Sequence, residues 1–432
     1  MKWNEFSNEK IGEKAFTAKH KSGLEIVVVP KERSHTFAVL GVNFGASDRK
    51  FRIKGETEWT ELPEGVAHFL EHKMFEDKDG VDAFSRFAAT GANANAFTSA
   101  EDTCYLFSCS EKEEENLRIL LDFVLHPYFS DATVAKEQGI IGEEIDMDAD
   151  QPGTAAYYGL MECLFHSHPV RDRICGSRES IAKITPGLLY RCTDCFYRPD
   201  NMVLAVCGKM TKEQVEAICD EMLPKKSPFP GVERWFPDEP DTVCKEKFES
   251  ESEIAQSLVE IGFKVPPAKS TAEALKQSAA NEISSAMLFG WSGEFYNRLY
   301  EEGLISDRFG GGFVQSVRLG FAYITVSAYC DKPEELQNAV CNEIEKRRKT
   351  YFTKEEFETA KKVVYTNKLF SMDSPEETAF SWVEHRFLGK DYLEYVTSLS
   401  EVTYEEARAI FKKTFKTDQK ALCVVSPKGG KL

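Results

Sequence analysis

The sequence predicts an α+β protein built from two related domains that each combine helices with strands. The chain has 432 residues, which is more than one ordinary domain holds. A proline-rich segment at 223–242 divides it nearly in half, and this composition is typical of a linker. A helix-like stretch followed by a strand-like run occurs at 184–207 and again at 402–425, shifted by 402 − 184 = 218 residues. The predicted domains are therefore 1–222 and 243–432.

The first half contains an H-x-x-E-H run, His68 to His72, with Glu71 inside it. Pro63 precedes the run and its interior lacks proline and glycine, so it is predicted to be helical. Side chains four apart share one face of a helix, so both imidazoles can reach one metal ion. Hydrolytic zinc sites combine two such ligands with a carboxylate base and a third ligand from elsewhere. The alternative is a pair of surface histidines on an amphipathic helix.

A second acidic segment offers the missing ligand. Glu137 and Glu144 are seven residues apart, so on a helix they lie two turns apart on one face. Glu144 follows His72 after 144 − 72 − 1 = 71 residues. A solvated acidic helix face would explain these charges, but it would not explain their coincidence with the histidine run.

Together these segments resemble the M16 (pitrilysin/insulinase) zinc metallopeptidases, which are inverzincins. The resemblance implies that His68, His72 and Glu144 bind Zn²⁺ and that Glu71 is the general base. It also implies that Glu137 supports the site by orienting a ligand histidine. Neighbouring Glu143 is the alternative third ligand.

The resemblance extends along the first half of the chain. The run 91–99 is similar to the family's substrate-binding edge strand, which implies that Asn95, Ala96 and Phe97 contact substrate. The segment Lys73-Met74-Phe75-Glu76 is most similar to a bacterial subfamily associated with lysine modification of elongation factor P.

The second half resembles the family's non-catalytic domain. At a shift of 223 residues, Ala360 and Asn367 stand where the first half has its two spaced glutamates. The family also uses an Arg and a Tyr seven apart to hold substrate. Arg298 matches the first, but Ile305 stands at the second position, and Tyr296 or Tyr300 are alternatives for the missing tyrosine.

Composition excludes several classes of function. The net charge of −17 argues against sequence-independent nucleic-acid binding and against an anionic membrane surface. No apolar run is long enough to span a bilayer, and the first residues lack the features of a signal peptide, so we expect a cytoplasmic protein. Cysteines in apolar runs are expected to be buried and reduced. They include Cys104, Cys207, Cys330 and Cys423.

The sequence thus predicts a zinc-dependent endopeptidase that binds extended peptides. The resemblance implies half of an M16-type clamshell, completed as a homodimer or as a heterodimer with an M16 homologue. One alternative is a catalytically weak or inactive subunit that binds peptides. Another is a zinc hydrolase acting on bonds other than peptide bonds.

Overall fold

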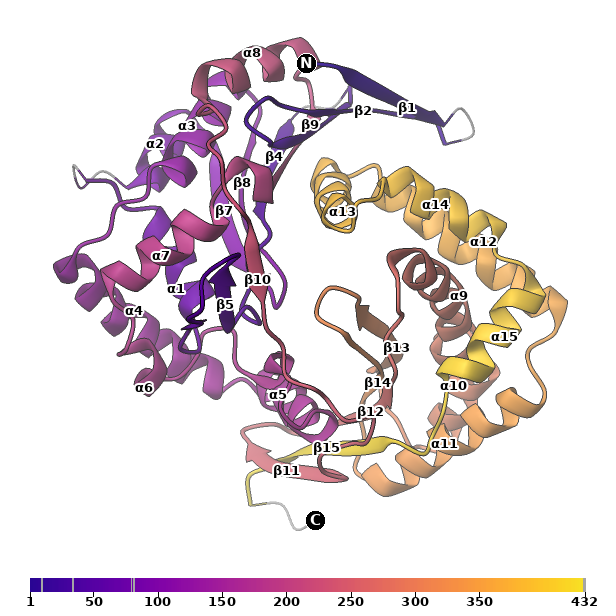
Figure 1. Ribbon diagram of the computed structural model, residues 1–432. Helices are drawn as coiled ribbons and strands as arrows, with labels where there is room; N and C mark the ends of the chain where they lie inside the picture. The colour runs from indigo at the N-terminus through magenta and orange to yellow at the C-terminus, as the bar shows by residue number, and fades with distance from the viewer. Residues whose placement is uncertain (9–10, 33–34, 79, 81, 430–432) are drawn as a thin grey trace. The chain divides into compact units, whose positions relative to one another are not determined.

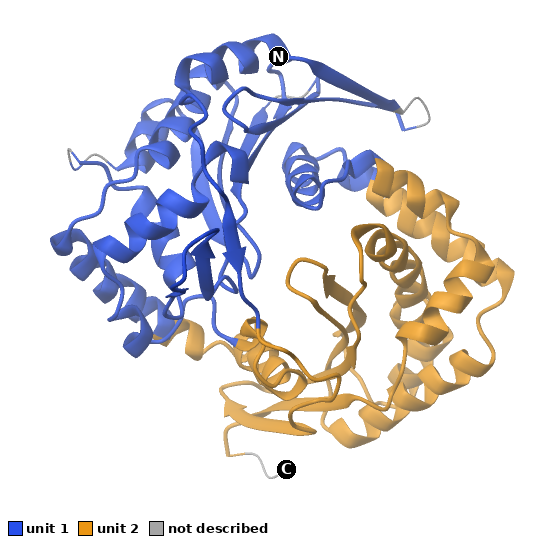
Figure 2. Cartoon of the chain, in the orientation of Figure 1, with its two compact units in different colours: residues 1–145, 172–236, 369–393 blue, residues 146–171, 237–368, 394–432 orange. Residues whose placement is uncertain are grey.

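The computed structural model describes residues 1–8, 11–32, 35–78, 80 and 82–429. It divides into two compact units, each assembled from separate stretches of chain (Figure 2). Unit 1 comprises residues 1–145, 172–236 and 369–393, and unit 2 comprises residues 146–171, 237–368 and 394–432. The domain boundaries predicted from the sequence stay a prediction. The labels used below are those of Figure 1.

Unit 1 is built on a seven-stranded sheet of order β1-β2-β3-β9-β4-β8-β7. Neighbouring strands are antiparallel, except that β3 and β9 are parallel to each other. The central strands β4 and β9 are buried along their whole length. The strands are β1 (Trp3–Asn8), β2 (Glu13–Lys19), β3 (Glu25–Pro30), β4 (Thr36–Val42), β7 (Asn93–Thr98), β8 (Thr103–Cys109) and β9 (Met202–Gly208).

Helices pack their apolar sides into one core with this sheet. They are α1 (Val66–Met74), α2 (Ala83–Ala89), α3 (Glu113–Leu125), α4 (Asp131–Ala149), α6 (Arg178–Ile181), α7 (Pro186–Phe196) and α8 (Lys212–Met222). Helix α1 begins after Gly65, whose φ of +86° favours glycine, and a Cβ there would lie 2.5 Å from the Cys175 carbonyl oxygen. The entry into α1 therefore depends on a residue without a side chain.

A small second sheet in unit 1 uses part of the proline-rich segment. Its order is β10-β5-β6, with β10 (Val232–Arg234) antiparallel to β5 (Lys50–Ile53) and β5 antiparallel to β6 (Thr60–Glu61). The segment is therefore not a free linker along its whole length, because three of its residues form a strand.

Unit 2 is built on a five-stranded sheet of order β11-β15-β12-β14-β13. Its first pair is parallel and the others are antiparallel, which repeats the pattern of β3-β9-β4-β8-β7 in unit 1. The strands are β11 (Lys247–Ser252), β12 (Leu258–Val265), β13 (Phe309–Ser316), β14 (Phe321–Tyr329) and β15 (Lys420–Pro427). The main helices are α9 (Thr271–Phe289), α10 (Glu294–Glu301), α11 (Pro333–Lys349), α12 (Lys354–Ser371), α14 (Tyr392–Glu401) and α15 (Tyr404–Thr414). The predicted α+β class is confirmed, and the sheets of both units are mostly antiparallel.

Each unit contains one helix from the other half of the chain. Helix α13 (Pro375–Phe387) packs on β4 and β9 in unit 1, and α5 (Pro152–Leu164) packs on β11, β12 and β15 in unit 2. The approach is close, because a Cβ at Gly41 would lie 2.5 Å from Val383 Cγ1 of α13. The two helices begin at Pro152 and Pro375, which are 375 − 152 = 223 residues apart, so they are equivalent elements of the repeat.

The prediction that cysteines in apolar runs are buried is confirmed. All twelve cysteines are free, and ten of them, including Cys104, Cys207, Cys330 and Cys423, are buried. Across the described part of the chain, no helix has both the length and the apolar character needed to cross a membrane.

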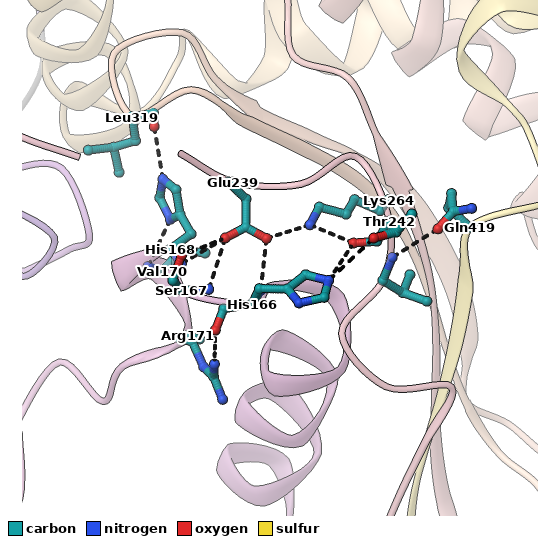
Figure 3. Close-up of polar contacts among 11 residues, drawn as sticks. His166, Ser167, His168, Val170, Arg171, Glu239, Thr242, Lys264, Leu319 and Gln419 are labelled. Atoms are coloured by element: carbon teal, nitrogen blue, oxygen red, sulfur yellow. Dashed lines mark hydrogen bonds and ion pairs between the residues drawn. The ribbon is translucent and has the colours of Figure 1, made fainter. Parts of the chain in front are cut away.

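A partly buried carboxylate anchors the proline-rich segment within unit 2 (Figure 3). Glu239 accepts hydrogen bonds from the backbone N–H groups of His166, Ser167 and His168 at 2.8, 2.9 and 2.9 Å, and Lys264 Nζ donates at 2.6 Å. Burial alone would raise the pKa of Glu239, but the Lys264 ammonium and the backbone donors outweigh it and lower the pKa to about 2.

We predict that Glu239→Gln lowers the free energy of unfolding by about 2 kcal/mol at neutral pH, since Lys264 loses its counter-charge. The folded pKa lies below its ordinary value of 4.5, so the carboxylate stabilises fully above pH 4.5 and loses its effect as the pH falls toward 2. The difference in unfolding free energy between wild type and variant, measured by denaturant titration, should therefore become smaller below pH 4.5. Glu246→Gln, at an exposed side chain, is the control. A difference in unfolding free energy between wild type and variant that stays constant below pH 4.5 would contradict this role of the carboxylate.

Candidate metal centre

Two helices bring three potential metal ligands together. His68 and His72 lie on one face of α1 with ring centroids 4.7 Å apart, and Glu144 reaches them from α4. Glu144 Oε1 is 3.4 Å from His68 Nε2, and Glu144 Oε2 is 3.4 Å from His72 Nε2. Ligand atoms of all three residues lie within 4.8 Å of one another. Helical spacing related His68 to His72 in the sequence, and the resemblance to M16 peptidases implied Glu144 as the third ligand.

Glu137 stands behind the triad. Its Oε1 lies 3.1 Å from His72 Nδ1, so with Nδ1–H donating to the carboxylate the lone pair of His72 Nε2 faces Glu144. Burial alone would lower the pKa of His72, but the hydrogen bond to Glu137 and the charge of Glu144 outweigh it and raise the pKa. The hydrogen bond from His68 and the charges of both histidines lower the pKa of Glu144 despite its partial burial.

The donor set fits zinc. Two imidazoles and one carboxylate are a known set of zinc ligands, and ligands about 2.1 Å from a tetrahedral ion lie about 3.4 Å from one another. Each histidine Nε2 lies at this distance, 3.4 Å, from one oxygen of Glu144, Oε1 for His68 and Oε2 for His72. The buried His68 Nδ1 has no hydrogen-bond partner among the described residues, whereas His72 Nδ1 has one.

Glu71 lies beside the triad rather than in it. It is buried, and Thr98 Oγ1 donates a hydrogen bond of 2.5 Å to its Oε2. Burial raises the pKa of Glu71, while the Thr98 hydroxyl and both histidines act in the opposite direction. Thr98 ends β7, so this hydrogen bond joins the carboxylate to the outermost strand of the sheet. Sequence reasoning did not single out Thr98, because only the tertiary fold places β7 beside α1.

The alternative ligand Glu143 points away from the histidines. Its side chain is 80% exposed and its Oε1 lies 3.1 Å from Arg178 Nη2. Since Glu143 is 100° from Glu144 around α4, only one of the two can face α1. The geometry therefore favours Glu144.

The predicted substrate residues occupy two different places. Asn95, Ala96 and Phe97 lie on β7, the last strand of the unit 1 sheet, with Asn95 and Phe97 exposed. The Phe97 ring contacts Phe380 of α13 at 5.3 Å, on the opposite face of the strand from Thr98.

The fourth predicted substrate residue, Arg298, belongs to unit 2. There its Nη2 binds Glu343 Oε2 at 2.9 Å. Tyr296 and Tyr300 stack on each other at 6.2 Å, and Tyr300 is exposed. A role for Arg298 in substrate binding stays a prediction.

Family models match both halves of the chain. Residues 57–177 match the model of the insulinase family, peptidase family M16, and residues 183–364 match that of the M16 inactive domain. The chain is 35% identical over 425 residues to the uncharacterized zinc protease YmfH of Bacillus subtilis, covering 97% of this chain and 98% of the relative. The chain belongs to peptidase family M16. Membership of the subfamily associated with lysine modification of elongation factor P stays a prediction.

Solved structures of M16 proteins share the fold. An M16-like peptidase from Alicyclobacillus acidocaldarius superposes with a TM-score of 0.91 at 30% identity, over 99% of both chains. A protease from Helicobacter pylori superposes with a TM-score of 0.80 at 17% identity, covering 96% of this chain and 100% of the other, which shows the fold alone.

We predict that Glu144→Gln loses zinc and that Glu143→Gln retains it. Replacing a ligand should cost more than the roughly 10–100-fold in affinity that is typical of changing a ligand's outer partner. Zinc per protein after dialysis, measured by atomic absorption, distinguishes the two variants. Zinc loss in Glu143→Gln alone would show that Glu143, and not Glu144, is the third ligand.

Proposed function

We propose that this M16 protein is a zinc-dependent endopeptidase that hydrolyses peptide bonds of extended peptides or flexible protein segments. The observation that carries the proposal is the convergence of His68, His72 and Glu144 beside a separate buried carboxylate, Glu71. A metal-binding role alone would not require the second carboxylate.

The residues divide the chemistry between them. His68, His72 and Glu144 would hold Zn²⁺, which when bound supplies a Lewis acid that polarises water and the scissile carbonyl. Glu71 removes a proton from the attacking water and returns it to the leaving amine. Thr98 occupies Glu71 Oε2, which leaves Oε1 to exchange the proton. Glu137 keeps His72 in the tautomer whose Nε2 is free to bind.

The edge of β7 is the proposed substrate platform. β7 pairs with β8 on one side and stands last in the sheet order, so an extended peptide can add as a further strand. Main-chain hydrogen bonds along Asn95 to Phe97 would hold the peptide with little demand on its sequence. The Thr98–Glu71 hydrogen bond would then fix the peptide's register relative to the base. The net charge of −17 favours basic or neutral peptides over acidic ones.

We further propose that a second subunit, either a second copy or an M16 homologue, completes the active assembly in the cytoplasm. The match of residues 183–364 to the inactive-domain model supports a division into catalytic and supporting parts. The same match supports the alternative function, a catalytically weak or inactive peptide-binding subunit. Cleavage by the purified wild type decides between the two.

Glu71→Gln should keep zinc and peptide binding while peptide cleavage falls on the order of 10²–10⁴-fold, because it removes the base and no ligand. A quenched-fluorescent peptide library digested by zinc-loaded wild type and variant, with products identified by mass spectrometry, measures this. Undiminished cleavage by the variant would rule out Glu71 as the base. No cleavage by the wild type, alone or with an M16 homologue, would favour the inactive-subunit alternative.

Thr98→Val should reduce kcat about tenfold with little change in KM or in zinc content, since it removes the hydroxyl that holds Glu71 but keeps the shape of the side chain. Thr98→Ser retains a donor and should recover most of the rate. Steady-state kinetics with one peptide compare the three proteins. Equal rates for the valine and serine variants would mean that the hydroxyl does not position Glu71.

A further inference from the structure

A fully buried lysine lies directly after the second histidine of the metal centre. The exposed fraction of Lys73 is 0%, although lysine is almost never fully buried unless its charge is paired. Lys73 is neither one of the proposed zinc ligands nor the proposed general base. Its partners therefore indicate why the fold accepts a buried ammonium here.

Lys73 Nζ lies between two carboxylates from two helices. It forms an ion pair with Glu76, just beyond the end of α1, and lies 3.9 Å from Glu137 Oε2 on α4. Glu76 Oε1 in turn lies 3.7 Å from Lys136 Nζ, also on α4. Charges of alternating sign thus join the two helices in the order Lys136 and Glu76, then Lys73 and Glu137, with the first and last residues on α4. We call these four residues the charge ladder.

The charge ladder ends on Glu137, which contacts the candidate metal ligand His72. The two oxygens of Glu137 have different partners, because Oε1 is 3.1 Å from His72 Nδ1 and Oε2 faces Lys73 Nζ. A carboxylate is planar, so holding one oxygen on a buried ammonium limits where the other can point. Glu137 is itself only 6% exposed and cannot rely on water to balance its charge.

We propose that Lys73 is a positioning residue of the metal centre, which acts through Glu137 to hold His72 in its binding orientation and so raises the affinity for zinc. The inference rests on the proposed function only in taking His68, His72 and Glu144 as the zinc ligands. All four residues of the charge ladder contribute to this positioning, since Lys136 and Glu76 hold Lys73 at the contact between the two ligand-bearing helices.

A purely structural role makes a different prediction. If Lys73 only neutralises Glu76, removing both charges together should restore the fold and the zinc affinity alike. If Lys73 acts through Glu137, removing both should restore the fold alone. If Lys73 acts through Glu137, replacing Lys73 should also have no effect on zinc affinity in a variant that lacks the Glu137 carboxylate.

The experiment compares Lys73→Met, Glu76→Gln, Glu137→Gln and the two double variants that contain Lys73→Met. Zinc affinity of each apoprotein is measured by competition with a chromophoric chelator, and thermal unfolding of the apoproteins reports on the fold. Lys73→Met should bind zinc about 10–100-fold more weakly, the range typical of changing an outer partner of a ligand. Adding Glu76→Gln should raise the midpoint of unfolding without recovering affinity. In the Glu137→Gln background, Lys73→Met should cause no further loss.

Wild-type affinity in Lys73→Met, recovery of affinity by Glu76→Gln, or additive losses with Glu137→Gln would each overturn the inference while leaving the zinc site intact. If Lys73→Met does not fold, the double variant with Glu76→Gln carries the same test of affinity. Failure of the wild type to bind zinc would instead overturn the proposed function, and this inference with it.

Discussion

The packing of α1 and α4 into one hydrophobic core is the constraint on which the candidate site depends. Phe69 and Leu70 of α1 and Ile141 of α4 are fully buried in that core. Because a helix turns 100° per residue, burying these side chains fixes the directions of the others. His68 Nε2 and His72 Nε2 then each lie 3.4 Å from an oxygen of Glu144, and all three residues are on helices. Rigid elements of this kind hold a metal site more accurately than loops do.

The glutamates of the site carry the same carboxyl group, but their surroundings shift their pKa values in different directions. Histidine contacts lower the pKa of Glu144, as suits a metal ligand, whereas burial raises the pKa of Glu71, as suits a group that exchanges a proton. Glu137 differs again, because it lies between a ligand histidine and the buried Lys73. Three glutamates within two helices thus have three different environments, and position rather than residue type separates their roles.

Helical periodicity relates His68 to His72 and Glu137 to Glu144, and the resemblance to M16 peptidases implied that the two helices form one site. The edge strand followed from resemblance in the same way. The contact between Thr98 and Glu71 could not be predicted, since it depends on how β7 lies beside α1. The placement of α5 in unit 2 and of α13 in unit 1 likewise depends on tertiary packing, and the proline at the start of each helix does not indicate it.

Lys73 shows the limit of reading residue types. A lysine beside two glutamates is typical of a solvated helix end, and only the packing of α1 buries it. β10 is similar, because three residues of a proline-rich segment find a partner in β5 that local composition does not indicate. In both cases long-range packing overrides a local preference.

The central claim is that His72 and His68 bind zinc through Nε2, together with Glu144. Anomalous diffraction at the zinc edge from crystals of the zinc-loaded protein tests it most directly. The account predicts one strong peak about 2.0–2.2 Å from both Nε2 atoms and from a Glu144 oxygen, with Glu137 still on His72 Nδ1. A peak elsewhere, or one bound through Nδ1 of His72, would contradict it.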